Sequence, residues 1–491
     1  MNTVDEQKKC PTSEMVKYSF GGCVESLVLN TFFGFAMFYY TKALGLSPEL
    51  AAIATAVATL WDAVSDPVMG YISDSTKSRY GCRYPYMLIG GIAMLITFFF
   101  IWYVPDTFKK ELVLGSLTIS STKMLFFYLV VMNLILRTAY TVFVVPYTAL
   151  GFEICDDYDG RSKIQGIRNG LNMAANLCGP AMAWFIFFGG NPENNKATQE
   201  AGNYVTMGTT FTIASFAFLF LMLFFTSKYI KDSRHTDTCP RGIKEFFKDI
   251  KDILLDKYPR WVFVFMFFVL LGIVLVSNLQ MYVFDDFMGL NGLQKTIAHG
   301  GTMVGMGLGS LSLAFFVRRF DKKGAICVAV FWSVFCELVL AVLFLTGFIK
   351  PGQVSFGVPI AFILFAFFHG AYWFGNGIMM PTAVSMMADV SEINRIKTGV
   401  NKDGSYAAMF SLAMKISMAV AFLVAGYCLS WTGFEAGAEA VQSDESMWRV
   451  CALTFVVGPI ASLAALILIS KYPVTKEFIE KVRSEDFAFE S

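Results

Sequence analysis

Two carboxylates and a hydroxyl group share one face of a strongly apolar stretch, residues 49–72. Asp62, Ser65 and Asp66 are spaced i, i+3 and i+4, which places their side chains on one side of a helix. A charged residue inside a membrane span costs about 2.5–3.5 kcal/mol on insertion scales, so charges there indicate function. Their oxygen atoms suit a small cation such as Na⁺, or a proton when one carboxyl group is protonated. Pro67 follows and removes a backbone donor, which could free a carbonyl group nearby.

Another apolar stretch, residues 124–150, carries the residues expected to face this group. It enters the membrane from the same side, and Arg137 lies about as far from its start as Asp62 lies from the start of the first stretch. Because a helix rises by about 1.5 Å per residue, Arg137 and Asp62 are expected at one depth, with Thr141 level with Asp66. We predict an Asp62–Arg137 pair beside an oxygen cluster of Ser65, Asp66 and Thr141. The alternative is that Arg137 only neutralises Asp62 for folding and that no ion binds.

Both stretches belong to a chain that is apolar along most of its length. Of its 491 residues, 55% are hydrophobic and only 16% are charged. This composition excludes a soluble multidomain protein and indicates a polytopic membrane protein. The net charge of +1 gives no sign of a nucleic-acid partner. Twelve stretches are long enough for a helix to cross the bilayer: 19–42, 49–72, 85–104, 124–150, 164–188, 205–227, 261–284, 294–317, 325–347, 355–388, 404–430 and 447–470.

The positions of the basic residues predict the topology. Most of the 39 Lys and Arg residues lie in the two terminal segments and in the loops that follow every second span. The positive-inside rule therefore predicts a multi-pass protein of the cell membrane with both termini in the cytoplasm. None of the ten Cys residues lies in a predicted external loop, so no disulfide framework is expected, and the polar N-terminus predicts no cleavable signal peptide.

The longest hydrophilic stretch divides the chain into two halves. We predict a cytoplasmic N-terminus (1–18), a first six-helix half (19–227), a central cytoplasmic loop (228–260), a second six-helix half (261–470) and a cytoplasmic tail (471–491). Apolar residues recur at helical spacing over 243–254, which predicts an amphipathic interfacial helix in the central loop. An all-α membrane protein with two six-helix halves has the arrangement of the major facilitator fold, in which substrate binds near the midplane.

The loop after the second span carries a further motif. In residues 70–83 a Gly, an Asp four residues later and several basic residues resemble the loop signature of the major facilitator superfamily. Asp74 at a helix C-terminus is unfavourable against the helix dipole unless it is paired, which predicts an Arg partner from a neighbouring helix end. Such pairs can close a cytoplasmic gate; the alternative is a solvated basic loop that only sets topology. The gate candidates are Asp74, Arg79, Arg83, Arg161 and Asp389.

Longer motifs are similar to those of one family within this superfamily. They are Trp61-Asp62-x-x-Ser65-Asp66-Pro67-x-Met69-Gly70, Tyr140-Thr141 followed by Pro146, Asp157-Tyr-Asp159-x-Arg161, Met387-Ala388-Asp389 and Lys415. Along most of its length the chain resembles the glycoside–pentoside–hexuronide:cation symporters. The resemblance implies that Asp62, Ser65, Asp66 and Thr141 form a Na⁺, H⁺ or Li⁺ site, that Lys415 lies close to this site, and that Arg168 contacts sugar.

The departures from this family concern the sugar. In its best-known member two aspartates bind a galactoside, and Val144 and Ser26 take their positions here. An aromatic residue that follows is replaced by Thr148, so the galactoside site is not reproduced. Arg137 has no equivalent in that member.

Other polar residues inside the spans are candidates for substrate binding. Glu25 and Asn30 in the first span could reach substrate, because a Glu in a span is seldom there for packing alone. In the tenth span, polar and aromatic side chains form a stripe at i, i+3, i+4 and i+7 that could stack on a sugar ring and bond its hydroxyl groups. Packing of the same stripe is an equally good interpretation. Its members are His369, Tyr372, Trp373 and Asn376. Glu337 in the ninth span has no assigned role.

Together these features predict a secondary transporter that couples Na⁺ or H⁺ to the symport of a sugar, a glycoside or a sugar acid by alternating access. Arg137 and Arg168 favour an acidic sugar. The alternatives are a cation-independent uniporter for the same substrates and a facilitator-fold carrier for an amphipathic lipid. Three His residues without metal-ligand spacing and no nucleophile motif argue against an enzyme. The expected partners are the substrate, the coupling ion and the lipid bilayer, with no cofactor, no other metal and a monomeric state.

Overall fold

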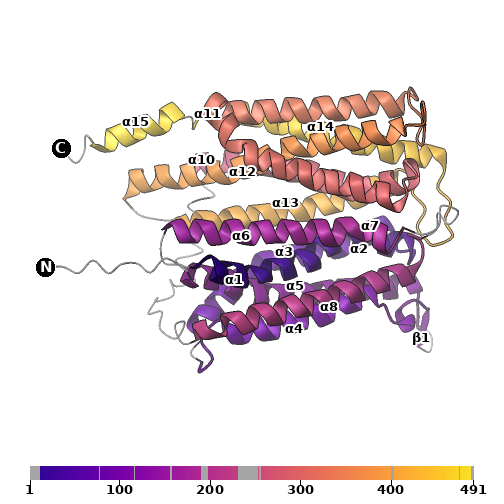
Figure 1. The fold of residues 1–491 in the computed structure, drawn as a ribbon, viewed down its shortest axis with the longest axis horizontal. Coiled ribbons are helices and arrows are strands. Elements are labelled where there is room, and N and C mark those ends of the chain that lie inside the picture. The colour runs from indigo at the N-terminus through magenta and orange to yellow at the C-terminus, as the bar shows by residue number, and fades with distance from the viewer. Residues whose placement is uncertain are drawn as a thin grey trace. The chain divides into compact units, whose positions relative to one another are not determined.

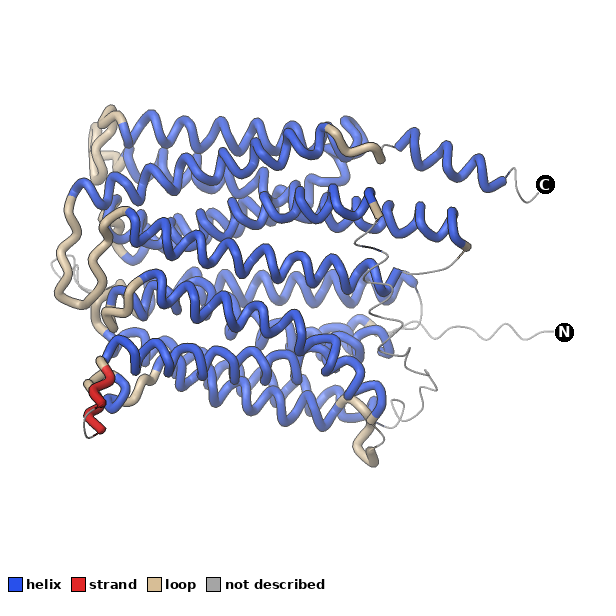
Figure 2. The backbone as a smooth tube through the Cα atoms, turned by 180° about the vertical axis from the view of Figure 1, so that it is seen from behind, coloured by secondary structure: helices blue, strands red, loops and turns tan. Residues whose placement is uncertain are grey.

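The computed structural model describes residues 11–76, 78–114, 117–154, 158–189, 197–230, 253, 256–399, 403–474 and 476–487. These residues are mainly helical, and β1 (Leu112–Leu114) and β2 (Leu117–Ile119) form a short antiparallel hairpin (Figure 2). Apart from Ile253, the helix expected over 243–254 lies outside the described residues. The chain forms two compact units, the first made of residues 1–240 and 436–440 and the second of residues 241–435 and 441–491.

The first unit contains six helical spans (Figure 1). Two of the spans, the first and the fifth, contain a π-helical turn. Such turns are rare and often occur at functional sites. The spans are α1 (Thr12–Glu25) with η1 (Ser26–Asn30) and α2 (Thr31–Lys42), α3 (Pro48–Ser75), α4 (Tyr84–Trp102), α5 (Ser121–Ile154), α6 (Tyr158–Asn176) with η3 (Leu177–Ala181) and α7 (Met182–Ile186), and α8 (Ala201–Thr226). Two short 3-10 helices, η2 (Asp106–Phe108) and η4 (Ser227–Ile230), follow α4 and α8.

The second unit also contains six spans and ends in a separate tail helix. They are α10 (Lys257–Tyr282) with η6 (Val283–Phe287), α11 (Gly292–Leu345), which holds two spans, α12 (Ile360–Thr398), α13 (Asp403–Trp431) and α14 (Asp444–Ser470), followed by α15 (Lys476–Phe487). Within α11 the backbone is non-helical at Asp321. This break falls in the short loop expected between the eighth and ninth spans.

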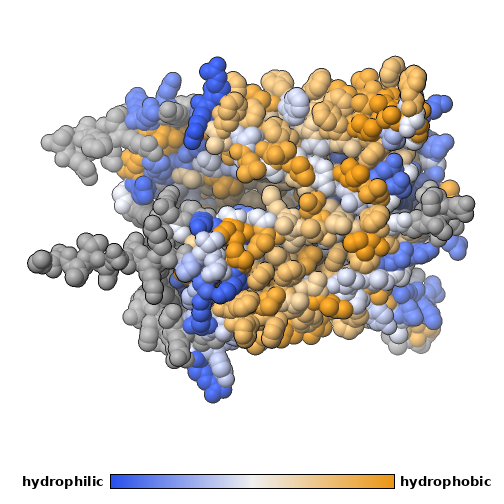
Figure 3. Space-filling model, in the orientation of Figure 1, coloured by the Kyte–Doolittle hydropathy of each residue, from blue (hydrophilic) through white to orange (hydrophobic). Residues whose placement is uncertain are grey.

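Hydropathy agrees with a membrane-spanning fold. Among the described residues, nine helical segments are long and apolar enough to cross a bilayer, and the 54-residue α11 counts as one of them. The other two spans, α3 and α6 with α7, carry the polar side chains of the site, which lowers their mean hydropathy. On the face shown in Figure 3, hydrophobic residues cover the middle of the helices and hydrophilic residues gather near the helix ends. The predicted all-α fold with twelve spans is therefore observed.

Glycines hold the first span of α11 against α12. A Cβ atom at Gly305 would lie 2.1 Å from the carbonyl oxygen of Gly370, and one at Gly309 would lie 2.0 Å from that of Phe374. Only residues without a side chain allow two membrane helices to approach so closely. This contact fixes α12 beside α11 in the second unit.

Asp321 has a backbone conformation that favours glycine, with φ 59° and ψ 173°. A non-glycine residue held in this region costs about 1–3 kcal/mol. Asp321→Gly removes this cost, but glycine also increases the chain entropy of the unfolded state, which offsets part of the gain. We therefore expect the substitution to stabilise the purified protein by about 1 kcal/mol. Thermal unfolding in detergent measures this. Asp321→Asn keeps the strained backbone and removes the charge, so an equal gain from Asn would show that charge, not conformation, causes the effect.

Candidate functional site

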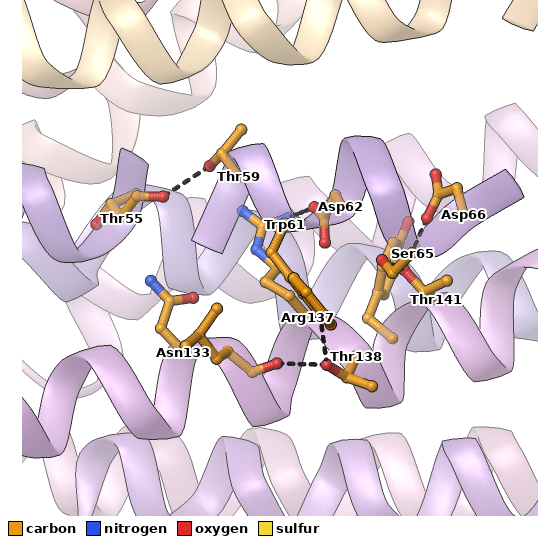
Figure 4. Close-up of polar contacts among 12 residues, drawn as sticks. Thr55, Thr59, Trp61, Asp62, Ser65, Asp66, Asn133, Arg137, Thr138 and Thr141 are labelled. Atoms are coloured by element: carbon orange, nitrogen blue, oxygen red, sulfur yellow. Dashed lines mark hydrogen bonds and ion pairs between the residues drawn. The ribbon is translucent and has the colours of Figure 1, made fainter. Parts of the chain in front are cut away.

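A buried ion pair joins α3 to α5 (Figure 4). Arg137 Nη1 donates a hydrogen bond to Asp62 Oδ2 at 2.9 Å, and the two residues are 3% and 4% exposed. The guanidinium group also lies over the ring of Phe33, 4.5 Å from its centroid. Arg137 Nε and Nη2 have no hydrogen-bond acceptor among the described residues. Asp62 and Arg137 thus lie together at one depth, as their spacing predicts.

One helical turn further along, three oxygen-bearing side chains converge. Thr141 Oγ1 donates to Asp66 Oδ1 at 2.7 Å, and Ser65 Oγ lies 3.2 Å from Thr141 Oγ1. A hydroxyl group has one hydrogen, so Ser65 donates to Thr141 while Thr141 donates to Asp66. The lone pairs of two hydroxyl oxygens and a carboxylate are therefore gathered in one place, which is the kind of ligand set that a small hard cation requires. The structure brings all four predicted cation-binding residues onto the α3–α5 contact.

Further contacts on both sides of this cluster hold α3 and α5 in register. Asn133 Nδ2 donates to the Ala54 carbonyl oxygen at 3.3 Å, and Trp61 Nε1 donates to Thr138 Oγ1 at 2.8 Å. Sequence reasoning gave Asn133 and Thr138 no role. The feature of the sequence that could have indicated them is that both are polar residues in the span that carries Arg137. Figure 4 shows these side chains along the same two helices.

A separate cluster joins α1, α5 and α6. Arg168 Nη2 donates to Glu25 Oε2 at 2.8 Å, and Tyr140 OH donates to Glu25 Oε1 at 3.0 Å. The Arg168 guanidinium lies 4.9 Å from the centroid of the Tyr147 ring. The side chains of Arg168 and Glu25 are 12% and 22% exposed, so this pair is less enclosed than Asp62–Arg137. Two predicted substrate residues, Glu25 and Arg168, are therefore partners of each other.

The remaining predicted substrate residues of the first unit lie near this cluster in the chain. Asn30 Nδ2 donates to Ser26 Oγ at 3.0 Å, and both residues belong to the π-helical turn η1. Val144 and Thr148 are partly exposed on α5. Their role in substrate binding stays a prediction.

The predicted residues of the tenth span are enclosed in the second unit. His369, Tyr372, Trp373 and Asn376 are all buried on α12, with exposed fractions from 0% to 6%. Asn376 Nδ2 donates to the Tyr372 carbonyl oxygen at 3.2 Å, and the Tyr372 and Trp373 rings meet edge to face. In this conformation the stripe presents no open surface on which a sugar could stack. Lys415 lies on α13, partly exposed, and its predicted closeness to the cation stays a prediction.

Ion pairs occupy the helix ends where gate residues are predicted. Arg83 bonds to Asp74 Oδ1 at 3.0 Å through Nη1 and to Glu153 Oε1 at 2.5 Å through Nε. Burial by itself lowers the pKa of Arg83. The negative charges of Glu153 and Asp74 have the larger effect and raise this pKa above its usual value. The partner expected for Asp74 is thus Arg83, and Glu153 is an addition that sequence reasoning missed.

The other gate candidates differ in their surroundings. Arg79 lies over the ring of Tyr80, 4.7 Å from its centroid. Asp389 in the second unit accepts a bond from Lys322 Nζ at 2.5 Å. The side chain of Arg161 lies outside the described residues. The gating role of all five residues stays a prediction.

Twelve spans in two six-helix units, with buried charges on facing helices, define a secondary transporter of the major facilitator type. A family model described as MFS/sugar transport protein matches residues 18–476, so this chain belongs to that family. The inner membrane symporter YicJ of Escherichia coli is 26% identical over 463 residues, which cover 94% of this chain and 91% of the relative. The glucuronide carrier protein homolog of Escherichia coli is 22% identical over 479 residues, which cover 95% and 94%.

A solved structure shares the fold. The inward-open xylose transporter XylE from E. coli superimposes with a TM-score of 0.62 over 96% of this chain and 99% of that one, at 15% identity. The expected membership in the glycoside–pentoside–hexuronide:cation symporters is confirmed. The chain is a multi-pass membrane transporter of a small molecule and not an enzyme.

Proposed function

We propose that this protein couples a monovalent cation, Na⁺ or H⁺, to the symport of a sugar acid or a related glycoside. The observation that carries the proposal is the convergence of Ser65, Asp66 and Thr141 on the α3–α5 contact, beside an Asp62 that already has a cationic partner. We assign the cation to the Asp66 end of this cluster, because three oxygen ligands meet there. A cation bound there would bring α3 and α5 closer and so favour one conformation of the first unit.

The Glu25–Arg168 pair supports an acidic substrate. A carboxylate on a sugar can take the place of Glu25 on the Arg168 guanidinium, because both groups offer two acceptor oxygens in a plane. Sugar hydroxyl groups can then donate to the displaced Glu25 and to Tyr140. The name of one relative, a glucuronide carrier homolog, is consistent with a substrate that carries such a group. We further propose that the protein lies in the cell membrane with both termini in the cytoplasm. We also propose that it works as a monomer and needs no cofactor.

Uptake into proteoliposomes tests the proposal. The panel contains a neutral pentose, a neutral disaccharide, a hexuronate and a lysophospholipid, each with no gradient, a Na⁺ gradient or a pH gradient. We expect the vesicles to accumulate the hexuronate against its concentration gradient when one of the two ion gradients is present. Counterflow without any effect of ions or membrane potential would identify a uniporter, and uptake of the lysophospholipid alone would identify a lipid carrier.

The substitution Arg168→Gln tests the acid preference. Loss of a charge-assisted bond to the substrate costs about 1.5–3 kcal/mol, which lowers apparent affinity for the acid about 10- to 100-fold. Affinity for a neutral sugar of the same size should fall much less. The matched control is Arg449→Gln, because Arg449 pairs on the surface with Glu445 one helical turn away. An unchanged ratio of acidic to neutral uptake in Arg168→Gln contradicts the preference.

A further inference from the structure

A carboxyl group and an imidazole meet inside the second unit, away from every residue assigned above to the cation. Glu337 on α11 and His369 on α12 approach to 3.4 Å between Oε1 and Nδ1. Their side chains are 0% and 1% exposed. On the other side of the ring, His369 Nε2 lies 2.8 Å from Oε1 of the buried Gln280 on α10. Three helices thus contribute one polar side chain each to this buried cluster.

The surroundings of this cluster are apolar. The rings of Phe365 and Phe284 pack on His369, with centroids 5.3 Å and 5.9 Å away. Neither oxygen of Glu337 accepts a hydrogen bond from any described residue, and no described Lys or Arg pairs with it. The other titratable groups near the cluster are His299 and Cys336 on α11, Tyr372 on α12 and Cys451 on α14. Lys295, one turn before His299, pairs with Asp285.

Hydrogen-bond chemistry limits the protonation states of the pair. Because Gln280 Oε1 accepts from Nε2, the hydrogen of a neutral His369 ring lies on Nε2 and Nδ1 carries a lone pair. Nδ1 lies 3.4 Å from Glu337 Oε1, and neither atom has a hydrogen-bond partner among the described residues, so one proton shared by the pair supplies the missing donor. Without the proton, a buried carboxylate would face a lone pair with no donor, which is among the most costly arrangements in a low-dielectric interior.

We propose that Glu337 and His369 form a proton-binding site in the second unit, filled while the site is buried and emptied when a conformational change admits water. The proposal needs the transporter fold but neither the cation at Asp66 nor any particular sugar. Na⁺ fits this cluster poorly, because the Gln280 oxygen is already bonded to His369 and the Glu337 side chain brings a single carboxylate, fewer oxygen ligands than a small hard cation requires.

Infrared spectroscopy of the purified full-length protein tests the site. A protonated carboxyl group absorbs above the amide band and shifts in D₂O. We expect such a band at neutral pH in the wild type and its loss in Glu337→Gln, which keeps the shape of the side chain. The matched control Glu445→Gln removes an exposed carboxylate and should keep the band. Identical spectra for Glu337→Gln and the wild type overturn the proposal.

Stability as a function of pH gives a second readout. A proton held by the folded protein and released on unfolding makes the wild type less stable as pH rises above about 6.5, the pKa of His in an unfolded chain. Glu337→Gln should lose this part of the slope, and Glu445→Gln should keep it. Parallel curves for the wild type and Glu337→Gln overturn the proposal. Neither measurement involves substrate or transport, so failure of the proposed symport activity would leave both results standing.

Discussion

Asp66→Asn should abolish the cation dependence of uptake. The substitution keeps the size of the side chain and the bond from Thr141, but it removes the negative charge that attracts the ion. Two unit charges about 4 Å apart interact by about 4 kcal/mol at the effective dielectric constant of a partly buried site. We therefore expect the ion concentration for half-maximal uptake to rise at least about 100-fold, with loss of uphill accumulation.

Measurements of uptake and counterflow in the same vesicles separate coupling from folding. Thr141→Val removes one oxygen ligand and should weaken ion activation by about 10-fold, the equivalent of roughly one hydrogen bond to a charged group. Its matched control is Thr138→Val on the same helix, because the Thr138 hydroxyl bonds to Trp61 and to the Leu134 carbonyl and not to Asp66. Unchanged ion dependence in Asp66→Asn would exclude this cluster as the coupling site.

The contact between α3 and α5 could be predicted from the sequence because depth in a membrane helix follows from counting residues. The rise per residue is fixed, so equal distances from the starts of two spans place Asp62 opposite Arg137 and Thr141 opposite Asp66. The family resemblance adds the role of these residues, since it implies that Asp62, Asp66 and Thr141 belong to a cation site. Asp62 and Arg137, as charges in apolar stretches, are also the residues that stand out most clearly in composition.

Contacts that depend on which helices lie side by side could not be predicted in this way. Nothing in the spacing of Glu337 indicates that α12 lies beside it, because that order follows from packing such as the glycine contacts of α11. The third member of the Arg83 cluster, Glu153, is missed for a similar reason. It lies near the far end of α5, about 70 residues from its partner.

The π-helical turn of the first span is also beyond sequence reasoning. Ser26 and Asn30 lie at i and i+4, which an ordinary α-helix would satisfy equally well, and no residue in between requires the wider turn. The turn packs closely on the fifth span, where a Cβ atom at Gly179 would lie 2.5 Å from Leu27. Hydropathy therefore gives the spans and their depths, whereas details such as this turn are seen only in the folded structure.

Arg137→Met should destabilise the protein by about 3–5 kcal/mol, the usual cost of removing one partner from a buried ion pair. Met has a similar length and no charge, so the guanidinium that balances Asp62 is lost with little change in volume. The double variant Asp62→Asn/Arg137→Met removes both charges and should recover most of the loss. Thermal unfolding of the three proteins in detergent measures these differences. Additive losses in the double variant would show that the pair contributes nothing specific.

The double variant also distinguishes two roles for Arg137. If the pair serves only to neutralise Asp62 for folding, the stable double variant keeps the ion dependence and the substrate preference of the wild type. If Arg137 contributes to coupling, stability recovers while ion activation changes, because the charges around Asp66 are no longer those of the wild type. The double variant removes an attractive carboxylate together with a repulsive guanidinium, so a fall in the half-maximal ion concentration shows that Arg137 repels the ion more than Asp62 attracts it, and a rise shows the reverse.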